Sequence, residues 1–150
     1  MERSDFTDIT FDRLKEAELG EIAKLYDAER IGIVTSQEKM KKVFKQIENN
    51  PDYILLTAKK EGKIVAFAKI EVHEDIFEEC KPYMTIWSVR VKKEDRRNKI
   101  GTILFQKIEE LAKQRNCDFL CLCADKENSI ANAFYQSLKY TKVNGYIKKL

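Results

Sequence analysis

The strongest constraint on the fold is the order of hydrophobic patterns between residues 83 and 124. Tyr83 to Val91 (YMTIWSVRV) is rich in β-branched and aromatic residues, as strands are. From about Lys99 to Arg115 apolar residues recur at helical spacing, and Asn98 is the expected N-cap. Asp118 to Ala124 (DFLCLCA) is almost continuously apolar, which is typical of a strand buried on both faces. A strand, a helix and a second strand predict a βαβ unit whose strands run parallel.

Helix and strand patterns also alternate on either side of this unit. Amphipathic helices are expected from about Leu14 to Ala28, from about Ser36 to Glu48 and from Ser129 to about Leu138. Further strands are expected at Phe6 to Phe11, at Tyr53 to Lys60 and, after a turn at Glu61-Gly62, at Lys63 to Glu74. In the last segment, Tyr140 to Leu150, the Asn144-Gly145 pair predicts a hairpin.

Length and charge narrow the class of protein. The chain has no internal repeat, low-complexity tract or linker, so residues 1–150 are expected to form a single domain. Its 28 Lys and Arg and 25 Asp and Glu leave a net charge of +3, and both signs are spread along the chain. A basic stripe with interleaved aromatic residues is missing, so we expect no nucleic-acid partner. No apolar run approaches eighteen residues, so we expect no membrane association and a cytoplasmic protein.

The cysteines do not form a metal-binding pattern. Cys80, Cys117, Cys121 and Cys123 contain no C-x-x-C spacing, and His73 is the only histidine. Three of the four cysteines lie in an apolar segment, so all are expected to be buried thiols. We therefore expect no metal site and no thiol catalysis.

Three cations stand where a helix is expected to begin. Arg96, Arg97 and Lys99 belong to the run RRNKIGTILF, and a helix N-terminus already carries a partial positive charge and unsatisfied N–H groups. This accumulation of positive charge predicts a bound anion, although cations solvated at the surface and partly compensated by Glu94 and Asp95 would give the same pattern. Neither a P-loop ending in Gly-Lys-Ser/Thr nor a G-x-G-x-x-G fingerprint is present.

The register from Val91 to Gly101 resembles motif A of the GNAT superfamily of N-acetyltransferases. In that motif a strand ends in Val, and an R/Q-x-x-G-x-G/A loop opens a helix. Arg96 takes the R/Q position and Gly101 the last glycine, while Lys99 replaces the first glycine. Downstream, NSIANAFYQSLKY is similar to the second cofactor motif of the family, although Lys139-Tyr140 stands in place of the closing Gly-Phe. The order of helices and strands is also similar along essentially the whole chain.

This resemblance implies a fold and an activity. The fold would be α+β and α/β-like, with a mixed central sheet of about six to seven strands, helices on both faces, and the fourth and fifth strands splayed apart. The activity would be transfer of an acetyl group from acetyl-coenzyme A to a primary amine by direct attack, without a covalent enzyme intermediate. The acceptor would be a small molecule or a peptide, and the protein a monomer or homodimer. A non-catalytic acyl-coenzyme A sensor and a cofactor-free interaction module stay as alternatives.

The resemblance also assigns cofactor contacts. Backbone groups on the fourth strand would pair with pantetheine and polarise the thioester, and backbone N–H groups of the loop would hold the pyrophosphate. Tyr135 would donate a proton to the departing thiolate, as the one predicted catalytic side chain. The cofactor-binding residues implied in this way are Val89, Arg90, Val91, Arg96, Arg97, Asn98, Lys99, Ile100, Gly101, Thr102, Asn128, Ala131 and Tyr135.

The acceptor site and the general base are less defined. The family builds its acceptor pocket from the first two helices, their loop, and the third and fourth strands, which here implies Tyr26, Glu29, Arg30, Ile31, Glu71, His73 and Trp87. Some members carry a glutamate base at the position that Thr85 takes here. Glu71, His73 and Glu74 can titrate and could act through water, Ser88 could hold a water, and an amine of low pKa would need no base.

Overall fold

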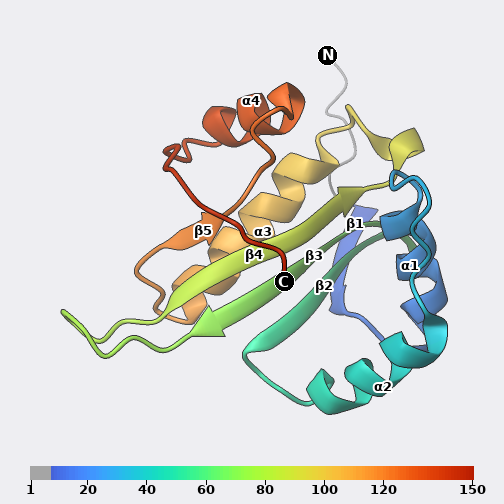
Figure 1. Cartoon of the computed structure of the whole chain (residues 1–150), viewed down its shortest axis with the longest axis horizontal. Coiled ribbons are helices and arrows are strands. Elements are labelled where there is room, and N and C mark those ends of the chain that lie inside the picture. Colours follow the sequence, from blue (N-terminus) through green and yellow to red (C-terminus); the bar gives the residue numbers. More distant parts are fainter. Residues whose placement is uncertain (1–7) are drawn as a thin grey trace.

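The computed structural model describes residues 8–150 and has a mixed α+β fold (Figure 1). Its elements in chain order are β1 (Ile9–Arg13), the 3-10 turn η2 (Glu16–Glu18), α1 (Leu19–Asp27), α2 (Gln37–Ile47), β2 (Tyr53–Lys60), β3 (Lys63–His73), β4 (Tyr83–Val91), the 3-10 turn η3 (Lys93–Asp95), α3 (Ile100–Gln114), β5 (Leu120–Leu122) and α4 (Ser129–Ser137). The strands form one sheet in the order β1-β2-β3-β4-β5. Neighbours are antiparallel except β4 and β5, which run parallel and confirm the predicted βαβ unit.

Most predicted elements are confirmed, with small shifts at their ends. The bounds of α2, β2, β3 and β4 lie within a residue of those predicted. The first helix is shorter than expected, because residues 16–18 form η2 and the α-helix begins at Leu19. The first strand begins at Ile9, while Phe6 and Thr7 of the predicted strand lie outside the described residues.

Two predictions for the end of the chain are wrong. β5 covers Leu120–Leu122 instead of residues 118–124, and it is half-buried rather than enclosed on both faces. Residues 141–150 contain no helix or strand, so the hairpin at Asn144-Gly145 is not formed, and the sheet of residues 8–150 has five strands, not six to seven. An isolated hairpin is only marginally stable, and a three-residue strand offers little edge to which it could add.

Helices cover both faces of the sheet. On one face Ile70 of β3 packs with Leu104 and Phe105 of α3, and aromatic residues of α4 join the same core. On the other face Phe67 of β3 packs with Phe44 of α2 in a second core that includes residues of α1. Side chains alternate along a strand, so the central strand β3 supplies both cores.

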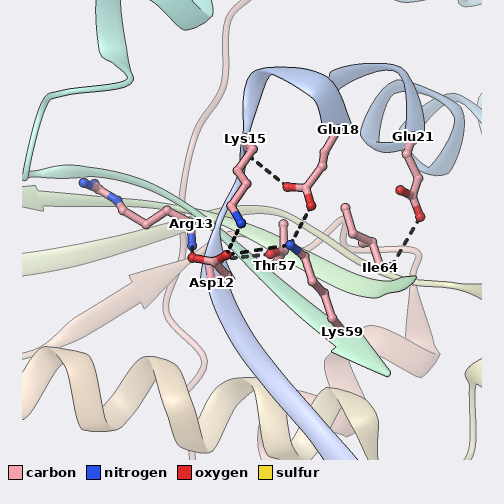
Figure 2. Close-up of polar contacts among 8 residues, drawn as sticks. All are labelled: Asp12, Arg13, Lys15, Glu18, Glu21, Thr57, Lys59 and Ile64. Carbon is pink, nitrogen blue, oxygen red and sulfur yellow. Dashed lines mark hydrogen bonds and ion pairs between the residues drawn. The ribbon is translucent and has the colours of Figure 1, made fainter. Parts of the chain in front are cut away.

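An ion network joins the start of the helical segment to β1 and β2 (Figure 2). The Lys59 ammonium, on a side chain that is only 11% exposed, contacts the Glu18 carboxylate and lies 3.8 Å from Asp12 Oδ2. Asp12 also pairs with Lys15 Nζ at 3.1 Å, and the Lys15 N–H donates to Glu18 Oε2 at 2.9 Å. We call Asp12, Lys15, Glu18 and Lys59 the Lys59 network.

Both central charges of the Lys59 network are favoured by folding. Burial opposes the ionisation of Glu18, but hydrogen bonds from Lys59 and from the Lys15 backbone outweigh it and lower the pKa of Glu18. The hydrogen bond to Glu18 raises the pKa of Lys59 despite its burial. The network therefore fixes η2 and the start of α1 against the sheet.

Candidate functional site

A β-bulge interrupts β4 near its end. Phe67 of β3 pairs with Arg90, but Lys69 pairs with Trp87, so β4 carries one extra residue in this interval. Ser88 lies within it and has a φ of 54°, in the left-handed region. Such a bulge changes which side chains share a face of the strand. Arg90 consequently shares the α1 face of the sheet with Trp87.

Beyond the bulge β4 separates from β5. β5 pairs with β4 only at Met84, Thr85 and Ile86, so residues 87–91 have no strand partner on that side within the described chain. The splayed fourth and fifth strands are thus confirmed. Two backbone carbonyls at the splay are used by arginine side chains: Arg90 Nη1 donates to Val89 O at 2.8 Å, and Arg96 Nε donates to Val91 O at 3.1 Å.

The loop after β4 turns through left-handed backbone into α3. Arg97 has a φ of 66° and Lys99 a φ of 59°. Lys99 is the N-cap of α3, so the prediction of Asn98 as N-cap is wrong. The left-handed residue sets the turn into the helix, which is why the related motif has glycine there. Within residues 8–150 no side chain caps the N-terminus of α3, so this part of the chain leaves its first N–H groups available to an anion.

The loop cations differ in their contacts. The Arg96 guanidinium forms an ion pair with Glu29, which lies just after α1, so a predicted acceptor residue contacts the predicted cofactor loop. Arg97 is exposed and makes no hydrogen bond or ion pair with another residue in the described range 8–150. Asn98 and Lys99 are also exposed, whereas Ile100 is buried in the core below the loop.

Gly101 lies where α4 packs closely against α3. A Cβ at this position would lie 3.2 Å from Cζ of Phe134 on α4 and 3.8 Å from Cγ2 of Val91. The glycine lets α4 approach the first turn of α3, beside the partly buried Thr102. The last glycine of the motif therefore has a packing role in this chain, whatever approaches the loop from outside.

The start of α4 is fixed by Asn128. Its side-chain Oδ1 accepts a hydrogen bond from the Ala131 N–H at 3.0 Å, as an N-cap residue does. Its main-chain carbonyl accepts a hydrogen bond from Asn132 Nδ2 at 2.7 Å. Asn128 thus positions the helix that carries Tyr135, and Ala131 is partly buried one turn before that residue.

Tyr135 lies in a group of aromatic rings between α3 and α4. Its ring centroid is 5.5 Å from those of Phe105 and Phe134 and 6.2 Å from that of Tyr140. Burial raises the pKa of Tyr135, and the positive charge of Arg90 partly opposes this rise. The phenol of Tyr135 therefore keeps its proton at neutral pH, and it interacts electrostatically with Arg90.

The predicted acceptor residues fall into separate groups. Tyr26 lies against two guanidinium groups: Cζ of Arg90 is 4.8 Å and Cζ of Arg30 is 5.1 Å from its ring centroid. Arg30 Nη1 also donates to the Tyr26 hydroxyl at 2.6 Å. Ile31 is fully exposed in the loop that follows, and Trp87 is 39% exposed.

A second set of polar side chains lies where the end of β3 pairs with the start of β4. His73 Nε2 is 2.9 Å from Thr85 Oγ1 and 3.9 Å from Glu71 Oε2, and Glu71 pairs across the strands with Thr85. The His73 ring stacks on Tyr83, with centroids 4.9 Å apart. Two titratable side chains therefore surround the position at which some relatives carry a glutamate base.

A hollow of about 430 Å³ lies between β5, α4 and the C-terminal segment. Tyr135 lines it, together with Leu122, Asn132 and Gln136, but the loop of residues 96–102 does not. In Figure 1 the C-terminal segment, in red, runs from α4 past the end of β5 and then, in this view, across β4.

The side chain of Arg90 was missed by the sequence reasoning, which used only the backbone of this residue. A cation inside a hydrophobic strand, directly before the charged loop, was the available signal.

The prediction of four buried thiols is wrong, because Cys80 and Cys123 are exposed and Cys117 and Cys121 are half-buried. Across residues 8–150 no cluster of three or more His, Cys, Asp or Glu could hold a metal ion. No helix in the same range is long and apolar enough to cross a membrane.

The splay of β4 from β5 beside the start of α3 is the arrangement that the resemblance to the GNAT superfamily implied, and a comparison with protein families supports that resemblance. The model of the acetyltransferase (GNAT) family matches residues 19–140, which include every predicted site residue. The chain therefore belongs to the GNAT acetyltransferase family, whose members generally use acetyl-CoA. Among curated protein sequences, none matches the chain significantly.

Solved structures share this fold at low sequence identity. A transcriptional regulator from Bacillus halodurans C-125 has a TM-score of 0.87 at 22% identity, over 95% of this chain and 99% of that one. An aminoglycoside acetyltransferase from an uncultured soil metagenomic sample has a TM-score of 0.78 at 22% identity, over 98% and 99%. Glucosamine-6-phosphate N-acetyltransferase from Arabidopsis thaliana has a TM-score of 0.77 at 18% identity, over 95% and 97%. At these identities the similarity defines the fold and not the acceptor.

Proposed function

We propose that this protein transfers an acetyl group from acetyl-CoA to a primary amine by direct attack. The observation that carries the proposal is the splay of β4 from β5 next to the N-terminus of α3, which no side chain of residues 8–150 caps. Tyr135 lies on α4, the helix that packs against the first turn of α3. We further propose that residues 1–150 act as one domain, in the cytoplasm, as a monomer or homodimer. The acceptor would be a small molecule or a peptide.

In this proposal the loop holds the pyrophosphate. The N–H groups from Asn98 to Thr102 surround the uncapped helix start, and Arg96 and Arg97 add positive charge on the solvent side. The backbone of Val89 to Val91 would pair with the pantetheine arm. That pairing requires Arg90 to release the Val89 carbonyl, to which its guanidinium now donates.

Proton transfers are assigned to three side chains. Bound acetyl-CoA would supply the acetyl group as an activated thioester. Tyr135, whose raised pKa keeps its phenol protonated at neutral pH, would donate a proton to the departing thiolate. Glu71 and His73 would accept the amine proton through Thr85 or a water, since His73 Nε2 lies 2.9 Å from Thr85 Oγ1.

Calorimetric titration with acetyl-CoA tests the cofactor part of this proposal, and thiol release with a panel of amines tests turnover. Arg96→Ala and Arg97→Ala should each weaken binding, and the loss should shrink as salt screens the charges. Lys113→Ala on the exposed face of α3 is the matched control and should bind as the wild type does. Unchanged affinity in both arginine variants would contradict the pyrophosphate assignment.

A further inference from the structure

Arg90 carries a polar atom that the described chain leaves without a partner. Its Nε is buried and makes no hydrogen bond to any residue in the range 8–150. One terminal nitrogen of the same guanidinium donates to the Val89 carbonyl, and the group lies 4.8 Å from the ring centroid of Tyr26. A buried donor without a partner is costly in a folded protein, so such a group is a candidate for binding a ligand.

Arg30 brings a second guanidinium group to the same tyrosine. Its Cζ is 5.1 Å from the Tyr26 ring centroid, and it donates to the Tyr26 hydroxyl at 2.6 Å. Neither Arg30 nor Arg90 forms an ion pair within the described residues. Of the neighbouring acids, Glu29 pairs with Arg96, and Asp27 accepts two hydrogen bonds from Thr35 at 2.7 Å. These hydrogen bonds, with a smaller contribution from the charge of Arg30, lower the pKa of Asp27.

The position of these charges matters for acyl transfer. Arg90 is the residue after Val89, whose backbone is proposed to contact the thioester, and the bulge turns its side chain toward α1. A guanidinium group binds a carboxylate through two parallel hydrogen bonds. If a carboxylate is held there, an amine a few bonds away on the same molecule would lie near the proposed position of the thioester.

Two nearby cations also favour a neutral amine. Positive charge close to an ammonium group disfavours its charged form and lowers its pKa. The amine would then lose its proton more readily, which suits a site with Thr85 in place of the glutamate base of some relatives. A polyamine would bring only positive charge to the same place and would be repelled.

We infer that the acceptor is a primary amine that carries a carboxylate within a few bonds of the nitrogen, and that Arg90 and Arg30 bind this carboxylate. The inference rests on the proposed acetyltransferase function and narrows its acceptor class to amino acids and closely related amino carboxylates.

Matched pairs of L-α-amino acids and their α-carboxamides test the inference, with spermidine and cadaverine as cationic probes. Calorimetry with acetyl-CoA comes first, because failure to bind would refute the proposed function itself. Thiol release then measures kcat/KM for each probe. The acid of the preferred pair is expected to exceed its amide at least tenfold, and both polyamines should be poor substrates.

Variants link this preference to the two arginines. In Arg90→Gln and in Arg30→Gln, the kcat/KM for the acid should fall close to that for the amide, mainly because the KM for the acid rises. Arg90→Lys should keep part of the preference, and Lys113→Gln, on the exposed face of α3, should keep all of it. Thermal unfolding checks that each variant is folded. If Arg90→Gln does not fold, Arg30→Gln still tests the inference. Two results would overturn the inference, provided that acetyl-CoA binds. One is a kcat/KM for the amides or polyamines that equals that for the acids, and the other is no turnover of any probe.

Discussion

The Lys59 network and the loop that begins at Arg96 use the same side-chain types in opposite ways. In the network, Lys59 and Lys15 each meet a carboxylate, and the charges join η2 to β1 and β2. In the loop, the described chain gives Arg97 no such partner and gives the N-terminus of α3 no side-chain cap. Charge that the chain itself neutralises stabilises the fold, whereas charge that it leaves open is available to a ligand. Substitutions in the network should therefore change stability, and substitutions around the loop and splay should change function.

The largest expected effect is on turnover, at Tyr135. Tyr135→Phe keeps the ring and its contacts with Phe105 and Phe134 but removes the proton. Turnover should fall within the roughly 10²- to 10⁴-fold range of general acid catalysis. Melting temperature and acetyl-CoA affinity should not change, as calorimetry can check. A variant that loses cofactor binding in proportion to activity would make Tyr135 a structural residue.

The next effect is on stability, at Lys59. Lys59→Met keeps most of the aliphatic stem but leaves the half-buried Glu18 carboxylate without its ammonium partner. We expect the free energy of unfolding in urea to fall by about 1–3 kcal/mol, with acetyl-CoA affinity unchanged. Lys60→Met, at the exposed next position of β2, is the matched control and should cost much less. Equal losses in the two variants would show that the network is not what stabilises this corner.

The same network predicts a pH dependence. The pKa of Glu18 is lower in the folded protein than its usual value of 4.5, so the folded state binds fewer protons there than the unfolded state. Its contribution to stability is thus present above pH 4.5 and is lost as the pH falls through the folded pKa. Unfolding titrations should show Glu18→Gln less stable than the wild type near pH 7, with a smaller difference near pH 3. A constant difference would contradict this linkage.

A smaller effect on binding is expected from Glu29. Glu29→Gln removes the carboxylate that competes with a bound pyrophosphate for Arg96, so acetyl-CoA affinity should rise. An exposed ion pair of this kind is worth up to about 1 kcal/mol, which corresponds to an increase of roughly two- to fivefold. Glu94→Gln removes the same charge from η3 without touching Arg96 and is the control. If both variants tighten binding equally, the cause is net charge and not competition.

The smallest effect is expected at Lys99. Lys99→Gly replaces a side chain that has a φ of 59° with the residue that adopts this conformation freely. We expect a gain in unfolding free energy of about 0.5–1 kcal/mol, because relief of strain exceeds the added entropy of the unfolded glycine. Acetyl-CoA affinity should fall slightly if the ammonium contacts a phosphate. Tighter binding would instead mean that the lysine crowds the loop.

Much of the fold followed from local patterns. The helical period of α3, the hairpin of β2 and β3 and the strand-helix-strand order all depend on residues that lie close together in the sequence. The prediction of a closing hairpin was wrong because it also used local sequence alone. The Asn144-Gly145 pair indicates turn propensity, but it does not indicate whether a strand edge is available for the hairpin to join. The N-cap shifted from Asn98 to Lys99 because the backbone of the whole loop, and not one side chain, sets the start of α3.

The candidate site shows the same division. The sequence by itself determined the family, the charged loop before α3 and the location of Tyr135, because spacing along the chain carries these features. Only the tertiary structure decided that Arg90 turns toward Tyr26, that Glu29 pairs with Arg96 and that Gly101 makes room for Phe134. Each of these contacts joins elements far apart in the sequence. The first depends on a single extra residue in β4, which changes the register with β3 without leaving a mark in the local hydrophobic pattern.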